Sequence, residues 1–588
     1  MSTQQTAILG RWQSYVQEGL HRLKGQNSIQ RLWNRDSSLW SSDPFVQQTI
    51  RNRLGWLEIP KVMAGQVPSL SQFVQAIRQE GFSQALLLGM GGSGLFTEVC
   101  HDTLATADAY LDLTVLDTTD PAAILSVQRR WDLKRLLVIV SSKSGTTLEV
   151  EALFAYFSEL LEKAGRDPSD CCIAITDAGT ALENQARRRQ YRQIFVHGPQ
   201  TGQDVGGRFS AFTYFGLVPA ALMGLDIAQL LDRALEMFKH CRLSSLQDNP
   251  AAVLGAAMAQ WFGAGKDKMT LICPPALESF GTWVEQLLAE STGKCGKGII
   301  PIVGEVLRSP SRYLPDRFFI ELQLRSQPDE AMEHHVMALA DAGHPVLRIQ
   351  WEDLYDLGGE AAKWCVATAV AGHLLGINPF DEPNVTQSKE QTKMLLTRYR
   401  QEGRFPLEKP WLAEDDLAVY GSVKSTCSFS EEESGKPFSQ PISRCLALWC
   451  QQIRPVDFVA VLSFLPRTPT LDESLRKIRQ KIADVWTKAT MLQFGPRYLH
   501  STGQLYKGGT DNGVFLLLTA EDSQGLTIPG MSLNFSVLKQ AQALGDFQAM
   551  AQQGRRILRV HLGGQPERSM AVLMRAFEEV LESVSVAS

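Results

Sequence analysis

From about residue 80 onward the chain alternates short apolar runs with segments long enough to form a helix. Four apolar runs of four to six residues, at 85–89, 113–116, 135–140 and 172–176, are each predicted to be a buried strand. Strands in this pattern are typical of a parallel sheet covered on both faces. Ligands bind at the carboxyl ends of the strands in such sheets, so we expect a site there.

The same pattern returns in a second block, where runs at 269–273, 318–322 and 345–349 predict further strands. Residues 1 to about 75 read instead as helical and partly polar. We expect this segment to be anchored on a neighbouring domain by Trp12, Trp33, Trp40 and Trp56. A polar stretch at about 400–440, with several prolines and an acidic run, indicates a connector that could be mobile.

The 588 residues are too many for one hydrophobic core, so several domains are expected. The predicted fold class is α/β, with two doubly wound parallel-sheet domains, a helical N-terminal segment and a C-terminal α/β unit. The predicted boundaries are 1–75 for the helical segment, 76–245 and 246–400 for the two sheet domains, 401–445 for the connector and 446–588 for the C-terminal unit.

Two strings of the second block recur near the C-terminus. ESTGKCGKG at 290–298 is echoed by HSTGQLYKG at 500–508, and GHPVLRI at 343–349 is echoed by GRRILRV at 554–560. The sequence separations between each string and its echo nearly agree: 210 residues from Glu290 to His500 and 211 from Arg348 to Arg559. Matching order and spacing predict a partial duplication that gives His500 the position of Glu290. Chance similarity of short glycine-containing strings is the alternative.

Composition excludes several classes of protein. The net charge of −5 gives no sign of a chain that binds nucleic acid or a membrane surface, since these need a basic face. No run approaches the roughly 20 apolar residues of a membrane span, and the N-terminus does not read as a signal peptide. The ten cysteines show no CxxC pair and no zinc spacing, which favours reduced thiols and a cytoplasmic location.

A glycine-rich loop, GMGGSG at 89–94, follows the first predicted strand and opens a helix. Glycines allow the backbone to approach an anion closely, and the start of a helix offers free N–H groups and the positive end of the helix dipole. The string also fits GxGxxG, so a dinucleotide site is the alternative. Asp117, just after the second strand, could then bind a ribose.

A second loop, SSKSGTT at 141–147, follows the third strand and leads into a helix with Glu149. Hydroxyls at this density form a cradle for a phosphate monoester, which a dinucleotide site does not require. The loop is not a P-loop, because GxxxxGK[ST] is absent. A helix cap without ligand is the alternative, but it explains only one or two of the hydroxyls.

These two loops together resemble the sugar isomerase (SIS) domain, which binds phosphosugars. Three further strings are similar to signatures of the phosphoglucose isomerase family: GGRFS at 206–210, QLLAESTGK at 286–294 and NPFDEPNVTQSK at 378–389. Within that family, LHSTGQLYKGG at 499–509 looks most like the isomerase half of transaldolase–phosphoglucose isomerase fusions, although no transaldolase portion is visible.

The resemblance implies an enzyme that interconverts glucose 6-phosphate and fructose 6-phosphate through a cis-enediol, with no cofactor and no metal. It also implies a homodimer, because members of the family usually complete the site across a dimer. Glu290 matches the family's base, and Arg208 matches the arginine that faces the enediolate. The residues expected to bind substrate are Gly92, Ser93, Ser142, Lys143, Ser144, Thr147 and Gln286.

Physical chemistry supports the two central roles. A carboxylate can move a proton between two carbons near neutral pH if its site adjusts its pKa. A fixed guanidinium stabilises developing negative charge and cannot lose its proton. A surface glutamate and a structural salt bridge are the alternatives for Glu290 and Arg208.

The residues that open the sugar ring are less plainly marked. Lys389 matches the family's lysine, but Glu382 stands where glutamine is usual, and Asn384 and Thr386 also depart from the pattern. The family's GxxGxH-type histidine segment is missing past Glu290. The histidines near that interval, His334, His335 and His344, lie on a predicted helix and its end and are expected to be exposed. His500 is the better candidate.

Three alternatives remain at this point. A broader isomerase would also accept mannose 6-phosphate, since both C2 epimers give the same enediol. A regulator that only binds phosphosugars would need the hydroxyl cradle but neither Glu290 nor Arg208, so their joint presence favours an enzyme. A metal-dependent isomerase would need a cluster of histidine and carboxylate ligands, which the sequence does not show.

Overall fold

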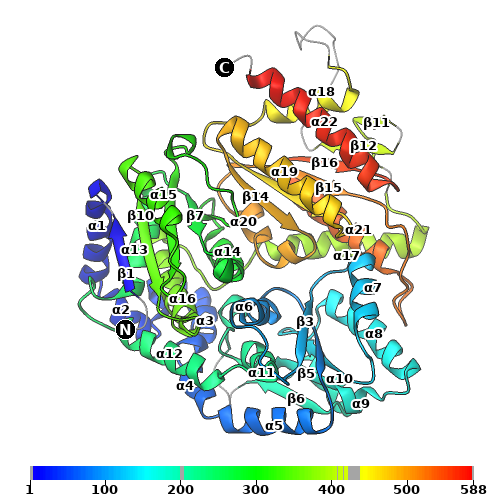
Figure 1. Cartoon of the computed structure of the whole chain (residues 1–588), viewed down its shortest axis with the longest axis horizontal. Helices are drawn as coiled ribbons and strands as arrows, with labels where there is room; N and C mark the ends of the chain where they lie inside the picture. The colour runs from blue at the N-terminus through cyan, green and yellow to red at the C-terminus, as the bar shows by residue number, and fades with distance from the viewer. Residues whose placement is uncertain are drawn as a thin grey trace.

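The computed structural model describes residues 4–8, 10–198, 204–406, 408–414, 416–421 and 438–585. Within these residues the chain forms three sheets flanked by helices (Figure 1). Most strands of each sheet run parallel, which confirms the predicted α/β class.

The first sheet has the order β3-β2-β4-β5-β6 and is parallel throughout. Its strands are β2 (Gln84–Gly89), β3 (Asp112–Leu116), β4 (Leu136–Ser141), β5 (Cys172–Asp177) and β6 (Gln193–His197). Four of the five coincide with predicted apolar runs, whereas β6 is a half-exposed edge strand with a weaker apolar signal. The order reverses between β2 and β4, and such a switch point opens a crevice at the strand ends.

Helices cover both faces of this sheet and continue beyond it. They are α6 (Leu95–Leu104), α7 (Pro121–Arg130), α8 (Leu148–Lys163), α9 (Pro168–Cys171), α10 (Ala181–Arg188), α11 (Tyr214–Leu222), α12 (Ile227–His240) and α13 (Pro250–Gly263).

The second sheet has the order β8-β7-β9-β10-β1. Its strands are β7 (Lys268–Ile272), β8 (Ile300–Ile302), β9 (Arg317–Leu324), β10 (Val346–Trp351) and β1 (Gln4–Ile8), and β1 alone runs antiparallel, along β10. Strand β1 departs from the helical prediction for the N-terminal segment. The open edge of β10 offers unpaired backbone groups, and pairing with such an edge overrides weak local preference. The helices of this part are α14 (Glu278–Thr292), α15 (Glu330–Asp341), α16 (Asp356–Leu375) and α17 (Val385–Glu402).

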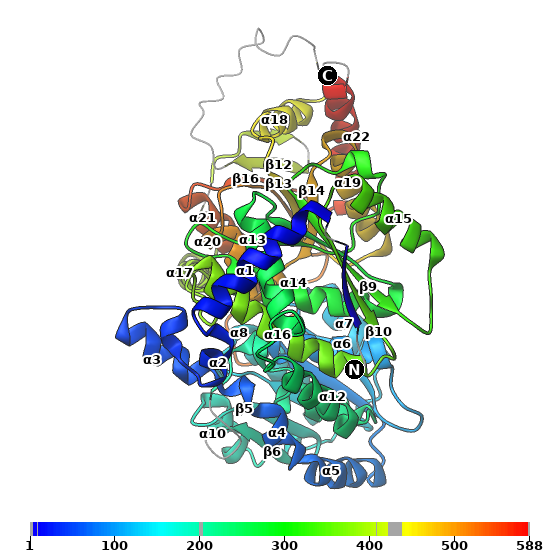
Figure 2. The same ribbon diagram turned by 90° about the vertical axis from the view of Figure 1, so that its left-hand side faces the viewer.

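The rest of the N-terminal segment is helical, and α1 packs on α13 at the side of the molecule (Figure 2). Its helices are α1 (Gln13–Gly25), α2 (Ser28–Trp33), α3 (Pro44–Arg53), α4 (Ile59–Ala64) and α5 (Val67–Gln79). The indole N–H groups of Trp12, Trp33 and Trp40 donate to the carbonyl oxygens of Gly343, Cys241 and Ala369. Trp56 stacks on Phe209 with ring centroids 5.3 Å apart. The tryptophans therefore fasten this segment to the body of the protein.

The third sheet has the order β11-β12-β16-β15-β13-β14. Its strands are β11 (Leu412–Glu414), β12 (Leu417–Gly421), β13 (Phe458–Phe464), β14 (Ala489–Phe494), β15 (Gly513–Thr519) and β16 (Arg556–His561). Residues 401–445, predicted as a connector, thus contribute the antiparallel strands β11 and β12, while 422–437 lie outside the described residues. The helices are α18 (Pro441–Cys450), α19 (Pro469–Trp486), η8 (Arg497–His500), α20 (Gly503–Gly508), α21 (Phe535–Gln552) and α22 (Pro566–Ser585).

The order of strands and helices supports one of the two sequence echoes as a structural equivalence and contradicts the other. Arg348 and Arg559 lie on β10 and β16, which hold matching places in the second and third sheets. Glu290, however, lies near the end of α14, between β7 and β8, whereas His500 follows β14. The prediction that His500 holds the position of Glu290 is therefore wrong. Ser, Thr and Gly recur wherever helices begin or end, so the shared STG string reflects local capping preferences.

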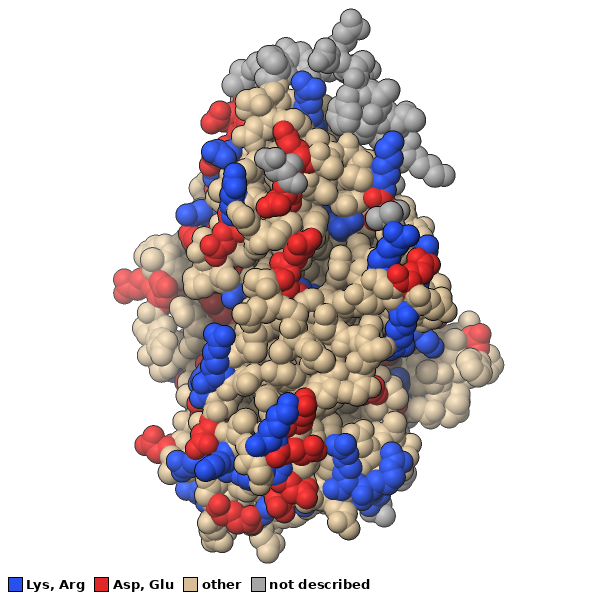
Figure 3. All heavy atoms as spheres, turned by 90° about the vertical axis from the view of Figure 1, so that its right-hand side faces the viewer, with Lys and Arg blue, Asp and Glu red and all other residues tan. Residues whose placement is uncertain are grey.

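The side of the molecule drawn in Figure 3 carries charges of both signs, and the basic and acidic side chains are intermingled there. Among the helices of the described residues, none has the length and apolar character needed to cross a membrane.

We expect the buried ion pair between Lys507 and Asp546 to be important for stability. The Lys507 ammonium lies 2.7 Å from the Asp546 carboxylate, and both side chains are almost fully buried. Lys507→Met would leave this carboxylate without its counter-charge and should lower the free energy of unfolding by about 3–5 kcal/mol.

Urea unfolding followed by tryptophan fluorescence measures this effect. The matched control is Lys477→Met, which breaks an exposed ion pair with Glu473 and should change stability by about 0–1 kcal/mol. Equal shifts of the unfolding midpoint in the two variants would contradict the prediction.

Candidate active site

The crevice at the carboxyl ends of β2 and β4 contains both predicted loops. The glycine loop after β2 approaches other backbone segments closely. A Cβ atom at Gly92 would lie 2.1 Å from the carbonyl oxygen of Gly207, and one at Gly91 would lie 2.9 Å from that of His500. Gly91 also has a φ of +53°. Glycine is therefore required where this loop contacts the Arg208 turn and the His500 turn.

The hydroxyl loop after β4 surrounds the start of α8. The Ser142 and Thr147 hydroxyls are 2.9 Å apart, and the Ser144 hydroxyl lies 3.5 Å from that of Thr147. The backbone N–H of Lys143 donates to the Ser93 hydroxyl, while its ammonium is bound by Asp204 at 2.5 Å and by Asp177. Hydroxyls around the positive end of a 16-residue helix suit a phosphate group.

Glu290 and Arg208 form a buried ion pair. Arg208 is 1% exposed, and its Nη1 lies 3.1 Å from Glu290 Oε1 and 3.0 Å from Glu382 Oε2. Its Nε donates to the Ser291 hydroxyl at 2.7 Å, and its Nη2 donates to the carbonyl oxygens of Pro379 and Asp381. The guanidinium is thereby fixed in one orientation.

Burial and neighbouring charges set the pKa values of this group. Burial raises the pKa of Glu290, the positive Arg208 lowers it and the negative Glu382 raises it, and the net direction is upward. Burial also raises the pKa of Glu382, but Arg208 and Arg53 outweigh this and leave it lowered. Glu290 is thus a buried carboxylate with enhanced basicity beside a fixed positive charge.

His500 reaches the same crevice from the third sheet. Its Nε2 lies 2.8 Å from Glu149 Oε1, which also accepts from Gln542 Nε2 at 2.8 Å. Gln542 Oε1 in turn accepts from the Thr119 hydroxyl at 2.7 Å. Burial raises the pKa of Glu149, but His500 outweighs it, so the net direction is downward. A carboxylate therefore orients this imidazole.

Gln286 joins the two parts of the site. Its Nε2 donates to the backbone carbonyl oxygen of His500 at 2.9 Å and lies 3.4 Å from Glu290 Oε2. It is buried on α14 one turn before Glu290, so its amide faces both neighbours.

A cavity of about 460 Å³ opens beside these residues. Its lining includes the hydroxyl loop and α17, with Ser144, Thr147, Glu149, Lys389, His500 and Gln542. Glu290 and Arg208 are not part of this lining, but Gln286 contacts both Glu290 and the backbone of His500, which is part of it. The structure therefore groups the hydroxyl loop, Lys389 and His500 around one cavity, whereas Gly92, Ser93 and Gln286 are not among its lining residues.

Two of these residues were missing from the predicted site. Glu149 follows the hydroxyl string by two positions, in the first turn of α8, and the sequence placed it on that helix without giving it a role. Gln542 lies in the middle of α21 and carries no sequence signal.

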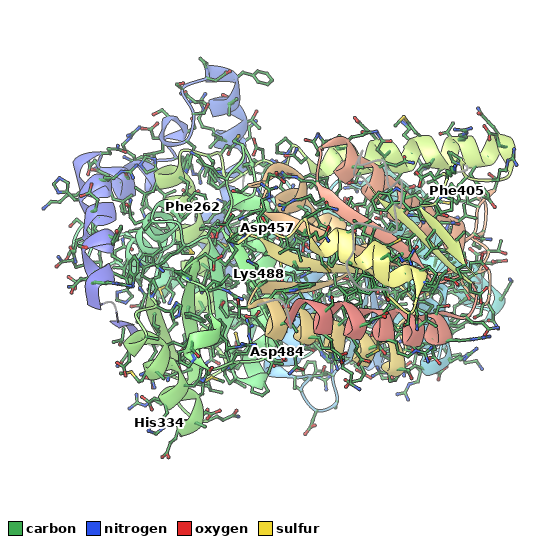
Figure 4. All side chains as sticks on the ribbon, turned by 90° about the horizontal axis from the view of Figure 1, so that it is seen from above. Phe262, His334, Phe405, Asp457, Asp484 and Lys488 are labelled. Carbon is green, nitrogen blue, oxygen red and sulfur yellow. The ribbon has the colours of Figure 1, made fainter. Side chains whose placement is uncertain are left out.

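The histidines in the sequence interval where the family has its ring-opening histidine do not line the cavity. His334 lies on α15 at the outer end of the molecule (Figure 4). His344 is buried, contrary to the expected exposure, because its ring packs against Tyr313 and against Phe319 near the start of β9.

The residue that supported a dinucleotide site has another partner. Asp117 Oδ2 accepts from Arg497 Nε at 2.6 Å, so this carboxylate is engaged by the third sheet. Within the described residues there is also no group of three His, Cys, Asp or Glu side chains placed to hold a metal ion.

Comparison with known proteins identifies relatives of the chain. Residues 66–299 match the sequence model of the family described as phosphoglucose isomerase. The probable glucose-6-phosphate isomerase of Methanococcus maripaludis is 24% identical over 424 residues, which are 66% of this chain and 94% of the relative. The glucose-6-phosphate isomerase of Bacillus cereus strain B4264 is 29% identical over 395 residues, which are 58% of this chain and 86% of the relative.

Solved structures show the same fold. A hypothetical protein of Thermus thermophilus superposes with a TM-score of 0.54 at 22% identity, covering 68% of this chain and all of the other. A glucose-6-phosphate isomerase of Chlamydia trachomatis gives 0.51 at 19% identity, covering 58% of this chain and 74% of the other. Residues 66–299 of the chain are therefore similar to the phosphoglucose isomerase family, and the named relatives and the fold agree with that similarity.

Proposed function

We propose that this protein is an aldose–ketose isomerase that interconverts glucose 6-phosphate and fructose 6-phosphate. The observation that carries the proposal is the buried Glu290 carboxylate, 3.1 Å from the fixed Arg208 guanidinium, next to a cavity with a hydroxyl cradle. The names of the relatives point to the same reaction. A phosphosugar regulator would need the cradle but not this ion pair.

In this proposal Glu290 moves the proton. Its carboxylate removes the proton from C2 of the open-chain aldose, and the electrons form a C1=C2 double bond while the former carbonyl oxygen takes the negative charge of a cis-enediolate. The proton of the C2 hydroxyl moves to the C1 oxygen, so that a carbonyl can form at C2. The same carboxyl group then returns the proton to C1 and yields the ketose. Its raised pKa makes it a stronger base near neutral pH, and Arg208 stabilises the negative charge on the two enediol oxygens.

The surrounding residues bind the substrate and open its ring. Ser142, Ser144 and Thr147 hold the phosphate at the start of α8, with Lys143 behind them. Gly92, Ser93 and Gln286 contact the sugar chain. His500, oriented by Glu149, and Lys389 exchange the proton between the ring oxygen and the C1 hydroxyl that ring opening requires.

The reaction as proposed consists of proton transfers, so it calls for no cofactor and no metal. Mannose 6-phosphate would give the same enediol, and a broader isomerase is therefore the second candidate. A cytoplasmic location and a homodimer, expected from the cysteines and from the family, belong to the same proposal. The cysteines at 100, 171, 172, 241, 273, 295, 365 and 450 are free thiols, which supports a reducing location, while Cys427 lies outside the described residues.

Glu290→Gln tests the base. The amide keeps the size of the side chain but cannot accept the proton, so kcat/KM should fall by about 10²–10⁴-fold or more. A coupled assay of fructose 6-phosphate conversion in EDTA measures this. The matched control is Glu278→Gln, an exposed glutamate at the start of the same helix, which should keep wild-type activity. Full activity of Glu290→Gln would refute the assigned role.

Glu382→Gln tests the charge balance around Arg208. Glu290 must be ionised to act, so activity is lost as the pH falls through its pKa. Removing the negative charge of Glu382 removes a cause that raises this pKa and releases Arg208 toward Glu290. The acid limb of the kcat/KM profile should therefore move to lower pH. Glu278→Gln serves as the charge-loss control, and an unmoved or raised limb in Glu382→Gln would contradict the explanation.

His500→Asn tests ring opening. Conversion of the cyclic hexose 6-phosphates should fall by about 10²-fold or more, since the proton transfer at the ring oxygen loses its catalyst. A tetrose 4-phosphate cannot close a ring, so its isomerisation should be largely spared. Proton NMR follows both reactions. An equal loss for the two substrates would show that His500 acts on the enediol step instead.

A further inference from the structure

The second and third sheets share one topology. The second unit, defined as the second sheet with α14, has the strand order β8-β7-β9-β10 followed by the antiparallel β1. The third unit, defined as the third sheet with α19, has the order β14-β13-β15-β16 followed by the antiparallel β12. In both, one helix joins the first two parallel strands: α14 lies between β7 and β8, and α19 lies between β13 and β14.

The two units meet through equivalent edges. The edge strands β8 and β14 contact each other, as do α14 and α20 (Figure 1). A hydrophobic cluster spans the junction, with Ile300 and Ile302 of β8 packed among side chains of the third unit such as Phe458 and Leu462. In the view from above, Asp457 and Lys488 lie where the two units join (Figure 4).

The contacts across this junction are reciprocal. The end of α14 contacts the segment after β14 through two hydrogen bonds. Gln286 donates to the carbonyl oxygen of His500, and Gln504 donates to the carbonyl oxygen of Gly293 at 2.9 Å. Conversely α19 touches the segment after β8, since Arg479 donates to the carbonyl oxygens of Val303 and Gly304 at 2.8 and 2.9 Å. Two copies related by a two-fold axis make such paired contacts.

Only one of the two equivalent contact regions holds catalytic chemistry. At the first region, α14 supplies Glu290 and the segment after β14 supplies His500, both facing the crevice of the first sheet. At the second region, the segment 303–316 has no histidine, and the buried Glu305 is held by Arg317 at 2.9 Å and by Arg308 at 3.3 Å. The charged side chains of the second region, Glu305, Arg308 and Arg317, are thus bound to one another.

We propose that the second and third units form an internal pseudo-dimer, in which the third unit occupies the place of a second copy. The second unit contributes Glu290 and the third contributes His500, and a single chain completes the isomerase site without residues from another chain. This inference rests on the proposed function, and it concerns where the site is completed, whatever the assembly of whole chains.

Mixing two inactive variants tests the proposal. Glu290→Gln and His500→Asn chains, with different affinity tags, are coexpressed and purified through both tags, and also mixed after separate purification. If sites were shared between chains, a mixed pair would rebuild one intact site and recover up to about half the wild-type activity per pair. A site built within one chain predicts no recovery above the sum of the two variants.

Controls separate this inference from the function itself. The activity of the wild-type protein by itself tests the proposed isomerase function, independently of where the site is completed. Wild-type chains paired with Glu290→Gln chains should retain half the activity per pair, and Arg312→Ala, an exposed residue at the reciprocal region, should keep wild-type kcat/KM. Circular dichroism confirms that each variant folds, and His500→Gln replaces His500→Asn if that variant does not.

If the chains do not associate and mixed pairs cannot form, dilution of the wild-type protein tests the proposal instead. Activity per chain should stay constant from micromolar to nanomolar concentration, with the mass followed by analytical ultracentrifugation. Recovery of activity on mixing would overturn the proposal. So would loss of activity as an oligomer dissociates, or full activity of a folded His500→Asn chain.

Discussion

The site depends on one buried positive charge. Arg208 carries its guanidinium into the interior, where an unpaired charge would be strongly unfavourable, and its contacts offset that cost. These contacts come from two separate parts of the chain: the end of α14 with Glu290 and Ser291, and the segment 379–382. Satisfying one guanidinium therefore brings together the first sheet, the second sheet and the approach to α17.

The same ion pair explains why Glu290 is suited to its proposed role. Burial alone would favour the neutral acid, and the adjacent Arg208 keeps an ionised carboxylate accessible. Glu382 competes for that arginine, so the balance between base strength and charge depends on this second carboxylate. Gln286 then couples this group to the turn that carries His500.

Much of the fold could be predicted from sequence, because buried parallel strands are continuous apolar runs. The loops at 89–94 and 141–147 were informative since glycines and clustered hydroxyls have few structural uses at strand ends. Strand β1 could not be predicted, because its five residues become a strand only by pairing with β10. Gln542 was equally hidden, since its role arises from contacts with Thr119 and Glu149 that are distant in sequence. The false equivalence of His500 with Glu290 shows that similar short strings must be checked against the order of the elements.

The central claim is that isomerisation proceeds by proton transfer through Glu290. Incubation of fructose 6-phosphate with the enzyme in deuterium oxide, followed by NMR of the recovered sugars, tests it most directly. The account predicts that the wild-type protein incorporates deuterium at C2 of the aldose and C1 of the ketose, and that Glu290→Gln incorporates almost none. Isomerisation without any label, as direct hydride transfer would give, or unchanged labelling by Glu290→Gln, would contradict it.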